Sequence, residues 1–122
     1  MQVTLLVRDC DEAAKWFCSR LGFSVKSDEK LAAGKRWLVL DAGGGADLVL
    51  ARAVNDEQRA AIGRQAGGRV GFFLKTEDFE RDVAKYADAG VQLLERPRSE
   101  PYGKVVQFAD LYGNKWDLIE PI

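Results

Sequence analysis

Residues 3–23, VTLLVRDCDEAAKWFCSRLGF, contain the pattern that decides the fold. Apolar residues alternate in its first part, which predicts a half-buried strand over 2–7. One face of this strand carries Val3, Leu5 and Val7, and the other carries Gln2, Thr4 and Leu6. Asp9 or Asp11 can cap a helix over 11–21, and Gly22 is suited to end it. The segment therefore predicts a strand that leads directly into an amphipathic helix, whose apolar stripe consists of Ala14, Phe17, Cys18 and Leu21.

The same order of elements returns in GRVGFFLKTEDFE, residues 68–80. Three residue pairs are each 69 apart in the sequence, and they are Asp9 with Asp78, Asp41 with Asp110, and Gly44 with Gly113. The two helix-ending glycines, Gly22 and Gly90, are 68 apart, which one deletion explains. Strand faces, caps and turns rarely stay in step by chance, so the chain is predicted to be an internal duplication. Its modules are 1–52 and 69–122, and the polar, glycine-containing stretch 53–68 is predicted to link them. Within the modules, a polar turn is predicted over 27–35, between short strands over 23–26 and 36–40, and a loop over 97–103.

Composition excludes several classes of protein. The 122 residues carry a net charge of −1, whereas a nucleic-acid surface needs a basic excess. No apolar run approaches the ~20 residues of a membrane span, and the N-terminus lacks a signal-peptide pattern, so we expect a cytoplasmic protein. The absence of histidine excludes Ser-His-Asp and Cys-His catalysis. Cys10 and Cys18 are expected to be free thiols in a reducing compartment.

A third segment, FADLYGNKWDLIEP at 108–121, has an Asp-x-x-Gly-Asn turn before a closing strand. With the two segments above, it resembles the glyoxalase/bleomycin-resistance/dioxygenase superfamily, also called vicinal oxygen chelate proteins. The resemblance implies an α+β fold in which two tandem βαβββ modules form a cup-shaped mixed β-sheet, with helices outside and a small molecule inside. The strand faces then direct Gln2, Thr4 and Leu6, and in the second module Gly71, Phe73 and Lys75, into the cup.

The resemblance also implies a divalent metal ion, held by one residue from each of four strands. The 69-residue spacing places these residues at Gln2, Leu48, Gly71 and Asp117. Gly71 and Leu48 offer no ligand atom, so we expect no metal cofactor. Asp47 neighbours Leu48 and is predicted to point to the opposite face, but a one-residue change of register would give a carboxylate pair with Asp117.

These features favour a small-molecule-binding protein that lacks the usual metal. Its candidate ligand-binding residues are Gln2, Thr4, Leu48, Gly71, Phe73, Tyr102 and Asp117. Asp117 is the best candidate for catalysis, because a carboxylate in an apolar cup can bind a cation or act as a base; a paired surface aspartate is the other interpretation. The resemblance also implies a homodimer, either side by side or with exchanged modules.

Three other functions remain open at this stage. One is a divalent-metal-dependent lyase, isomerase or dioxygenase of the same superfamily. Another is metal-free acid–base catalysis by Asp117, assisted by Tyr102 or Lys75. The third is a partner-protein module whose cup is filled by side chains. Whether the protein is an enzyme is left open, with a preference for binding alone.

Overall fold

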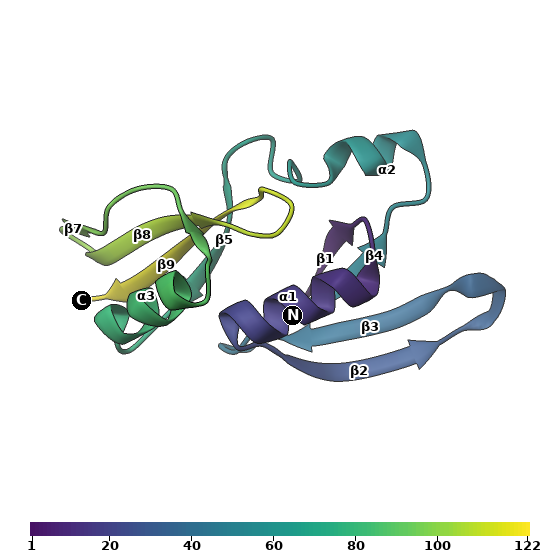
Figure 1. The fold of residues 1–122 in the computed structure, drawn as a ribbon, viewed down its shortest axis with the longest axis horizontal. Helices are drawn as coiled ribbons and strands as arrows, with labels where there is room; N and C mark the ends of the chain where they lie inside the picture. Colours follow the sequence, from purple (N-terminus) through teal and green to yellow (C-terminus); the bar gives the residue numbers. More distant parts are fainter. The chain divides into compact units, whose positions relative to one another are not determined.

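The computed structural model describes residues 1–122, which divide into two compact units, Met1–Ile62 and Gly63–Ile122. The first unit contains β1 (Gln2–Val7), α1 (Cys10–Leu21), β2 (Ser24–Lys30), β3 (Arg36–Asp41), β4 (Asp47–Arg52) and α2 (Asp56–Ala61). Its four strands form one sheet in the order β1-β4-β3-β2, in which only β1 and β4 are parallel. Helix α1 packs on one face of this sheet (Figure 1).

The core of the first unit lies between α1 and the sheet. Leu5 and Val7 are fully buried, as the alternation in β1 predicts. Asp9 is the N-cap, since its side chain accepts a hydrogen bond from the Glu12 N–H at 2.8 Å. The buried stripe of α1 consists of Ala13, Phe17 and Leu21, which are spaced four residues apart. Ala14 and Cys18, which the sequence placed on this stripe, are only half-buried, because the helix turns Ala13 toward the sheet instead. Burial of Phe17 or Leu21 stabilises the unit by about 1.5–3 kcal/mol each.

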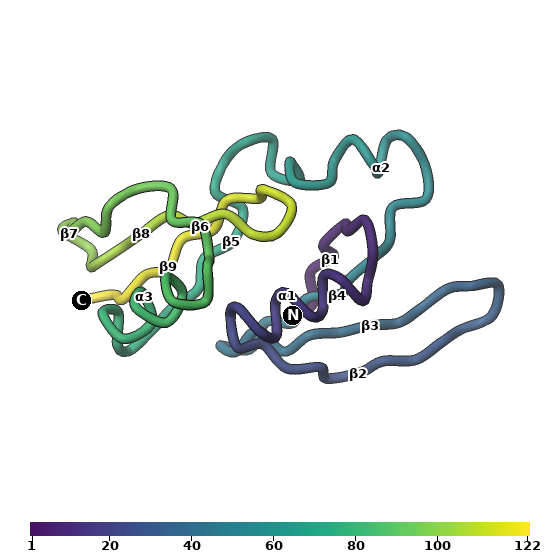
Figure 2. Tube along the Cα trace, in the orientation of Figure 1, coloured from purple at the N-terminus to yellow at the C-terminus, as the bar shows by residue number.

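Strands β2 and β3 form a long hairpin, which is easily followed in Figure 2. The prediction of a polar turn over 27–35 is wrong, because β2 continues to Lys30 and the turn is confined to Ala32–Gly34. Strand β2 lies at the sheet edge, where charged side chains face solvent and protect the edge from pairing with other chains. Its polar sequence therefore reflects an edge strand rather than a loop.

The second unit repeats this arrangement with one additional strand. It contains β5 (Val70–Lys75), α3 (Phe79–Asp88), β6 (Gln92–Leu93), β7 (Arg98–Glu100), β8 (Gly103–Ala109) and β9 (Lys115–Pro121). The sheet order is β5-β9-β8-β6, and β7 pairs with β8. The sequence predicted a loop where β7 lies. The βαβββ order of the first unit, repeated in the second with β7 added, confirms the predicted α+β fold class.

Aromatic rings form the core between α3 and the second sheet. Phe72 on β5 stacks on Trp116 on β9, with ring centroids 4.4 Å apart. Phe108 on β8, the other strand beside β9, has its ring centroid 5.9 Å from that of Trp116. Tyr86 from α3 meets Phe108 edge-on at 5.3 Å. Offset and edge-to-face geometries of this kind add about 0.5–1.5 kcal/mol per pair beyond area burial. These rings fill the face of the sheet that packs against α3.

A buried aspartate organises the turn between β8 and β9. Asp110 accepts hydrogen bonds from the Tyr112 and Asn114 N–H groups at 3.0 Å, the Asn114 side-chain amide at 3.0 Å and Trp116 Nε1 at 2.9 Å. The Gln65 N–H in turn donates to Asn114 Oδ1 at 3.2 Å. The start of the second unit is thereby tied to the turn that leads into β9. No helix of the protein has the length and apolar character that a membrane crossing requires.

Candidate functional site

The first unit separates its predicted site residues onto two faces of the sheet. Gln2 and Thr4 are exposed on the face away from α1, as predicted. Leu48, which the 69-residue spacing placed with them, is only 5% exposed and packs on the helix side. The neighbour of Gln2 on β4 is instead Asp47, since these two residues are Cα partners in the parallel ladder.

A change of spacing explains the misplacement of Leu48. In the first sheet Leu40 pairs with Leu48, and in the second sheet Phe108 pairs with Trp116, so the later strands of the two units are related by 68 residues rather than 69. The deletion seen between Gly22 and Gly90 therefore persists to the last strand. On this spacing the first-unit counterpart of Asp117 is Val49, whose side chain also has no ligand atom.

Asp47 lies on the exposed face but is already paired. Its Oδ2 atom is 2.9 Å from Nζ of Lys26, which reaches across from β2. The Asp47 side chain is only 13% exposed, so the ammonium group occupies much of the space from which a cation would approach. Asp47 does lie beside Gln2, but the register change that would have made it the counterpart of Asp117 does not occur, because Val49 takes that position and Asp47 has a lysine partner.

The second unit brings Phe73 and Asp117 together on its exposed face. They are Cα partners on β5 and β9, and Gln107 on β8 flanks Asp117 on the other side. The Phe73 side chain is 63% exposed, whereas Asp117 is half-buried. Oδ1 of Asp117 is buried and has no hydrogen-bond partner. This face thus combines an accessible aromatic ring with an unsatisfied carboxylate oxygen.

The electrostatics around Asp117 favour its neutral form relative to an ordinary aspartate. Burial raises its pKa, the positive charge of Arg98 opposes this, and the negative charge of Glu95 reinforces it. Burial is the largest of these effects because desolvation penalises the charged carboxylate. The carboxyl group can therefore accept a hydrogen bond from a ligand or, when protonated, donate one.

A network that the sequence did not reveal holds Arg98 beside this face. Arg98 Nε donates to Glu95 at 3.1 Å, and Nη1 donates to Glu100 at 2.7 Å. Hydrogen bonds to Glu100, Tyr102 and Glu95 raise the pKa of Arg98. Glu95 also accepts the Gln107 N–H at 3.1 Å, so it fixes the strand next to Asp117. The Glu95, Arg98 and Glu100 spacing is the only sequence signal for this network.

The remaining predicted residues lie at the margins of the second sheet. Tyr102 is in the turn between β7 and β8, is 51% exposed and reaches Arg98 by its side-chain hydrogen bond. Gly71 lies where the β5–β9 register shifts. A Cβ atom on Gly71 would be 3.0 Å from Cβ of Ala66, so the residue is small because the preceding segment packs over it.

The residues present do not fit the divalent metal that the resemblance implies. Neither unit has a group of three or more histidine, cysteine or carboxylate side chains suited to hold a metal ion. Asp117 is the one carboxylate at a predicted ligand position, and imidazole, the usual partner for Fe, Ni and Zn, does not occur in the chain. The groups that this face does offer are the Phe73 ring and the Asp117 carboxyl group.

Comparison with known proteins gives a consistent family assignment. The family model of the Glyoxalase/Bleomycin resistance protein/Dioxygenase superfamily matches residues 1–118. A protein of Shewanella frigidimarina, described as uncharacterized, is 42% identical over 123 residues, which cover 98% of this chain and 91% of the relative.

Two solved structures are similar over nearly the full chain. The crystal structure of UcmS2 has a TM-score of 0.83 and 25% identity, covering 98% of this chain and 95% of the other. TnmS3, an antibiotic binding protein from Streptomyces sp. CB03234, has a TM-score of 0.78 and 26% identity, covering 99% and 93%.

Proposed function

Because the chain belongs to the glyoxalase/bleomycin resistance protein/dioxygenase superfamily, we propose that it binds a small aromatic organic molecule without using a metal ion. The ligand lies on the exposed face of the second sheet, against Phe73 and Asp117. The observation that carries this proposal is Oδ1 of Asp117, a buried oxygen without a hydrogen-bond partner beside a largely exposed ring. An unsatisfied buried acceptor is costly, and a ligand donor would remove that cost.

The two side chains have different roles in the proposed complex. Phe73 offers a ring face for stacking, which contributes about 0.5–1.5 kcal/mol beyond the area it buries. Asp117 orients the ligand through a hydrogen bond, which contributes about 1.5–3 kcal/mol when one partner is charged. A ligand with an aromatic ring and a nearby hydroxyl, amide or ammonium donor fits both groups.

The similarity to TnmS3 supports the binding of a natural-product-like compound, since that protein is an antibiotic binding protein. The lack of a fitting metal donor set supports binding over the metal-dependent lyase, isomerase or dioxygenase alternative. The proposal assigns no catalytic step to Asp117.

A thermal-shift screen with aromatic, cationic and antibiotic compounds, followed by calorimetric titration of the hits, tests the proposal. Phe73→Ala is expected to weaken binding about two- to twelvefold, the size of one stacking contact, and Asp117→Asn about ten- to 150-fold, the size of one charge-assisted hydrogen bond. Val25→Ala and Asp88→Asn, which change an exposed apolar side chain and an exposed aspartate elsewhere, are matched controls. A screen without hits, or equal losses in controls and test variants, would refute the proposal.

Metal content distinguishes the alternative. Stoichiometric Ni, Zn, Mn or Fe in protein purified without chelator, measured by elemental analysis, would establish the metal-dependent reading and overturn ours. We expect substoichiometric metal that does not change when Asp117 is replaced by asparagine.

The proposal extends to assembly and location. We propose a homodimer, because the sheets expose apolar side chains such as Phe73 and Trp37 that a second chain can cover. Sedimentation velocity should therefore show a species of twice the chain mass, and a monomer at every concentration would contradict it. A cytoplasmic location agrees with the two free cysteines.

A further inference from the structure

Strands β3 and β4 separate toward one end of the first sheet. They pair only where Val39–Asp41 faces Asp47–Val49. Before Val39, β3 pairs with β2 alone, and beyond Val49, β4 pairs with β1 alone. A pocket of about 550 Å³ lies at this end, framed by the start of α1, the β2–β3 turn and the end of β4. Its volume falls within the ~300–1,000 Å³ of small-molecule sites.

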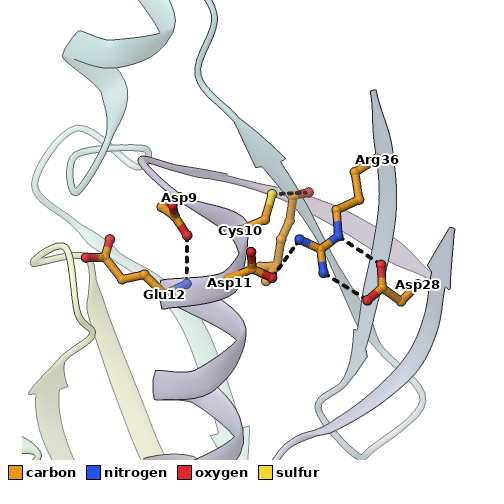
Figure 3. A network of polar contacts seen from close by, with 7 residues as sticks. Asp9, Cys10, Asp11, Glu12, Asp28 and Arg36 are labelled. Carbon is orange, nitrogen blue, oxygen red and sulfur yellow. Dashed lines mark hydrogen bonds and ion pairs between the residues drawn. The ribbon is translucent and has the colours of Figure 1, made fainter. Parts of the chain in front are cut away.

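One arginine links the elements beside this pocket, and Figure 3 shows its contacts with Asp28 and Asp11. Arg36 on β3 donates from Nε and Nη2 to the two carboxylate oxygens of Asp28 at 2.8 and 2.9 Å, and from Nη1 to Asp11 at 2.7 Å. The first pair joins the two strands of the hairpin, and the second ties the hairpin to α1. The Arg36 side chain is 22% exposed, whereas Asp11 and Asp28 are 80% and 39% exposed, so the arginine is the sheltered member of the cluster. Its contacts link α1, β2 and β3 at the edge of the pocket.

The acidic groups around the pocket already have partners. Asp11 is bound to Arg36, and Asp9 accepts the Glu12 N–H as the helix cap. Cys10 stays a neutral thiol at pH 7, because burial raises its pKa, and its Sγ donates to the Leu50 carbonyl in a long contact of 3.8 Å.

The basic groups of the lining have fewer partners. Lys35 and Arg52 line the pocket, are exposed, and take no part in the ion pairs of the first unit. Arg36 uses three of the five N–H groups of a guanidinium in the contacts above and retains two. Lys35 and Arg52 are therefore the cations of the lining that remain available to a ligand.

Apolar side chains complete the lining. Leu31 is 50% exposed and Val54 62% exposed, and both border the same pocket with Ala33 and Ala51. We propose that this pocket is a second binding site, distinct from the Phe73 face, and that it takes a small organic anion with an apolar body. The carboxylate or sulfonate of the ligand lies toward Lys35 and Arg52, and its apolar body covers Leu31 and Val54.

Titration with 2-naphthoate, followed by backbone amide chemical shifts, tests the proposal. We expect shifts at Gly34, Lys35 and Ala51, and much weaker binding of 2-naphthylmethylammonium, which has the same ring and the opposite charge. Combined Lys35→Gln and Arg52→Gln substitution should raise the dissociation constant about five- to tenfold, as for the loss of two exposed ion pairs.

The control variant combines Lys85→Gln with Arg69→Gln, which removes the same two charge types from exposed positions of the second unit. It should leave the dissociation constant within about twofold of the original. Unchanged pocket amides at millimolar 2-naphthoate, equal binding of the ammonium analogue, or equal losses in both double variants would each overturn the second site. Shifts confined to the Phe73 and Asp117 amides would overturn it and support the proposed function, so the two proposals fail separately.

Discussion

Replacement of Asp110 by asparagine is expected to lower the free energy of unfolding by about 3–6 kcal/mol. The side chain keeps its shape, and Oδ1 still accepts the Tyr112 and Asn114 N–H groups. Oδ2, however, accepts from the Asn114 side-chain amide and Trp116 Nε1, which are both buried. In the asparagine variant a nitrogen takes the place of Oδ2, and this nitrogen is itself a hydrogen-bond donor that cannot accept from these two groups. Two charge-assisted hydrogen bonds of about 1.5–3 kcal/mol each are therefore lost.

Urea denaturation followed by circular dichroism measures this loss. Asp41→Asn is the control, since Asp41 ends β3 at the corresponding hairpin of the first unit, is exposed and accepts only the Gly43 N–H at 2.8 Å. The control should cost at most about 1 kcal/mol. Similar losses in the two variants would refute the view that buried acceptor capacity at Asp110 holds the turn before β9.

Three further outcomes follow from local geometry. Gly103→Ala should destabilise the protein by about 2–4 kcal/mol in urea denaturation, because the added Cβ would lie 2.2 Å from the Glu120 carbonyl oxygen at a φ of +148°. Gly44→Ala, whose Cβ would meet open space, should cost about 1 kcal/mol, and equal costs in the two variants would contradict this reasoning. Asp117→Asn should be more stable than the original protein at pH 7 but not near pH 3, because folding raises the pKa of Asp117 above 3.8 and the stability of the original protein therefore falls as pH rises through the folded-state pKa. A gain in stability that does not depend on pH would exclude the titration of Asp117 as its cause. The Cys10 thiol, whose pKa burial raises, should react with a disulfide reagent more slowly than free cysteine at pH 7, and equal rates would show that it is not sheltered.

The local features of the fold were readable from the sequence because each depends on a short-range rule. Alternation in β1 placed Leu5 in the core, since strand side chains point to opposite faces in turn. Asp9 caps α1 because an aspartate ahead of an apolar helix satisfies its free N–H groups. The βαβββ order followed from the repetition of these signals.

The register of the later strands was not readable in the same way. Asp41 and Asp110 suggested that the 69-residue spacing continues, but Asp41 ends a strand and Asp110 begins a turn. Turn residues recur for their own local reasons, so their coincidence does not fix which strand residues pair. Only the hydrogen-bonded ladders show that Leu48 corresponds to Trp116 and faces the core.

Contacts between distant charged residues were also beyond the sequence. Arg36 meets Asp11 across 25 positions, and Lys26 meets Asp47 across 21. Both pairs form because the long β2–β3 hairpin brings β2 and β3 beside α1 and β4, and that hairpin was predicted too short. The pocket beside Arg36, between α1, the β2–β3 turn and β4, could therefore not be predicted from the sequence. The positions of Phe73 and Asp117 could be predicted, because strand alternation alone puts them on the exposed face of the second sheet.

The exposed face of the second sheet that carries Phe73 and Asp117 cannot enclose a ligand by itself. A sheet surface covers one side of a ligand, whereas small-molecule sites typically bury about 70–90% of the ligand's surface. Stacking on Phe73 and one hydrogen bond to Asp117 supply a few kcal/mol, and association itself costs about 4–15 kcal/mol. Tight binding therefore requires a second surface over the ligand, which the proposed homodimer supplies. Ligand binding and self-association should then strengthen each other, because a molecule held between two chains stabilises the state in which they are joined.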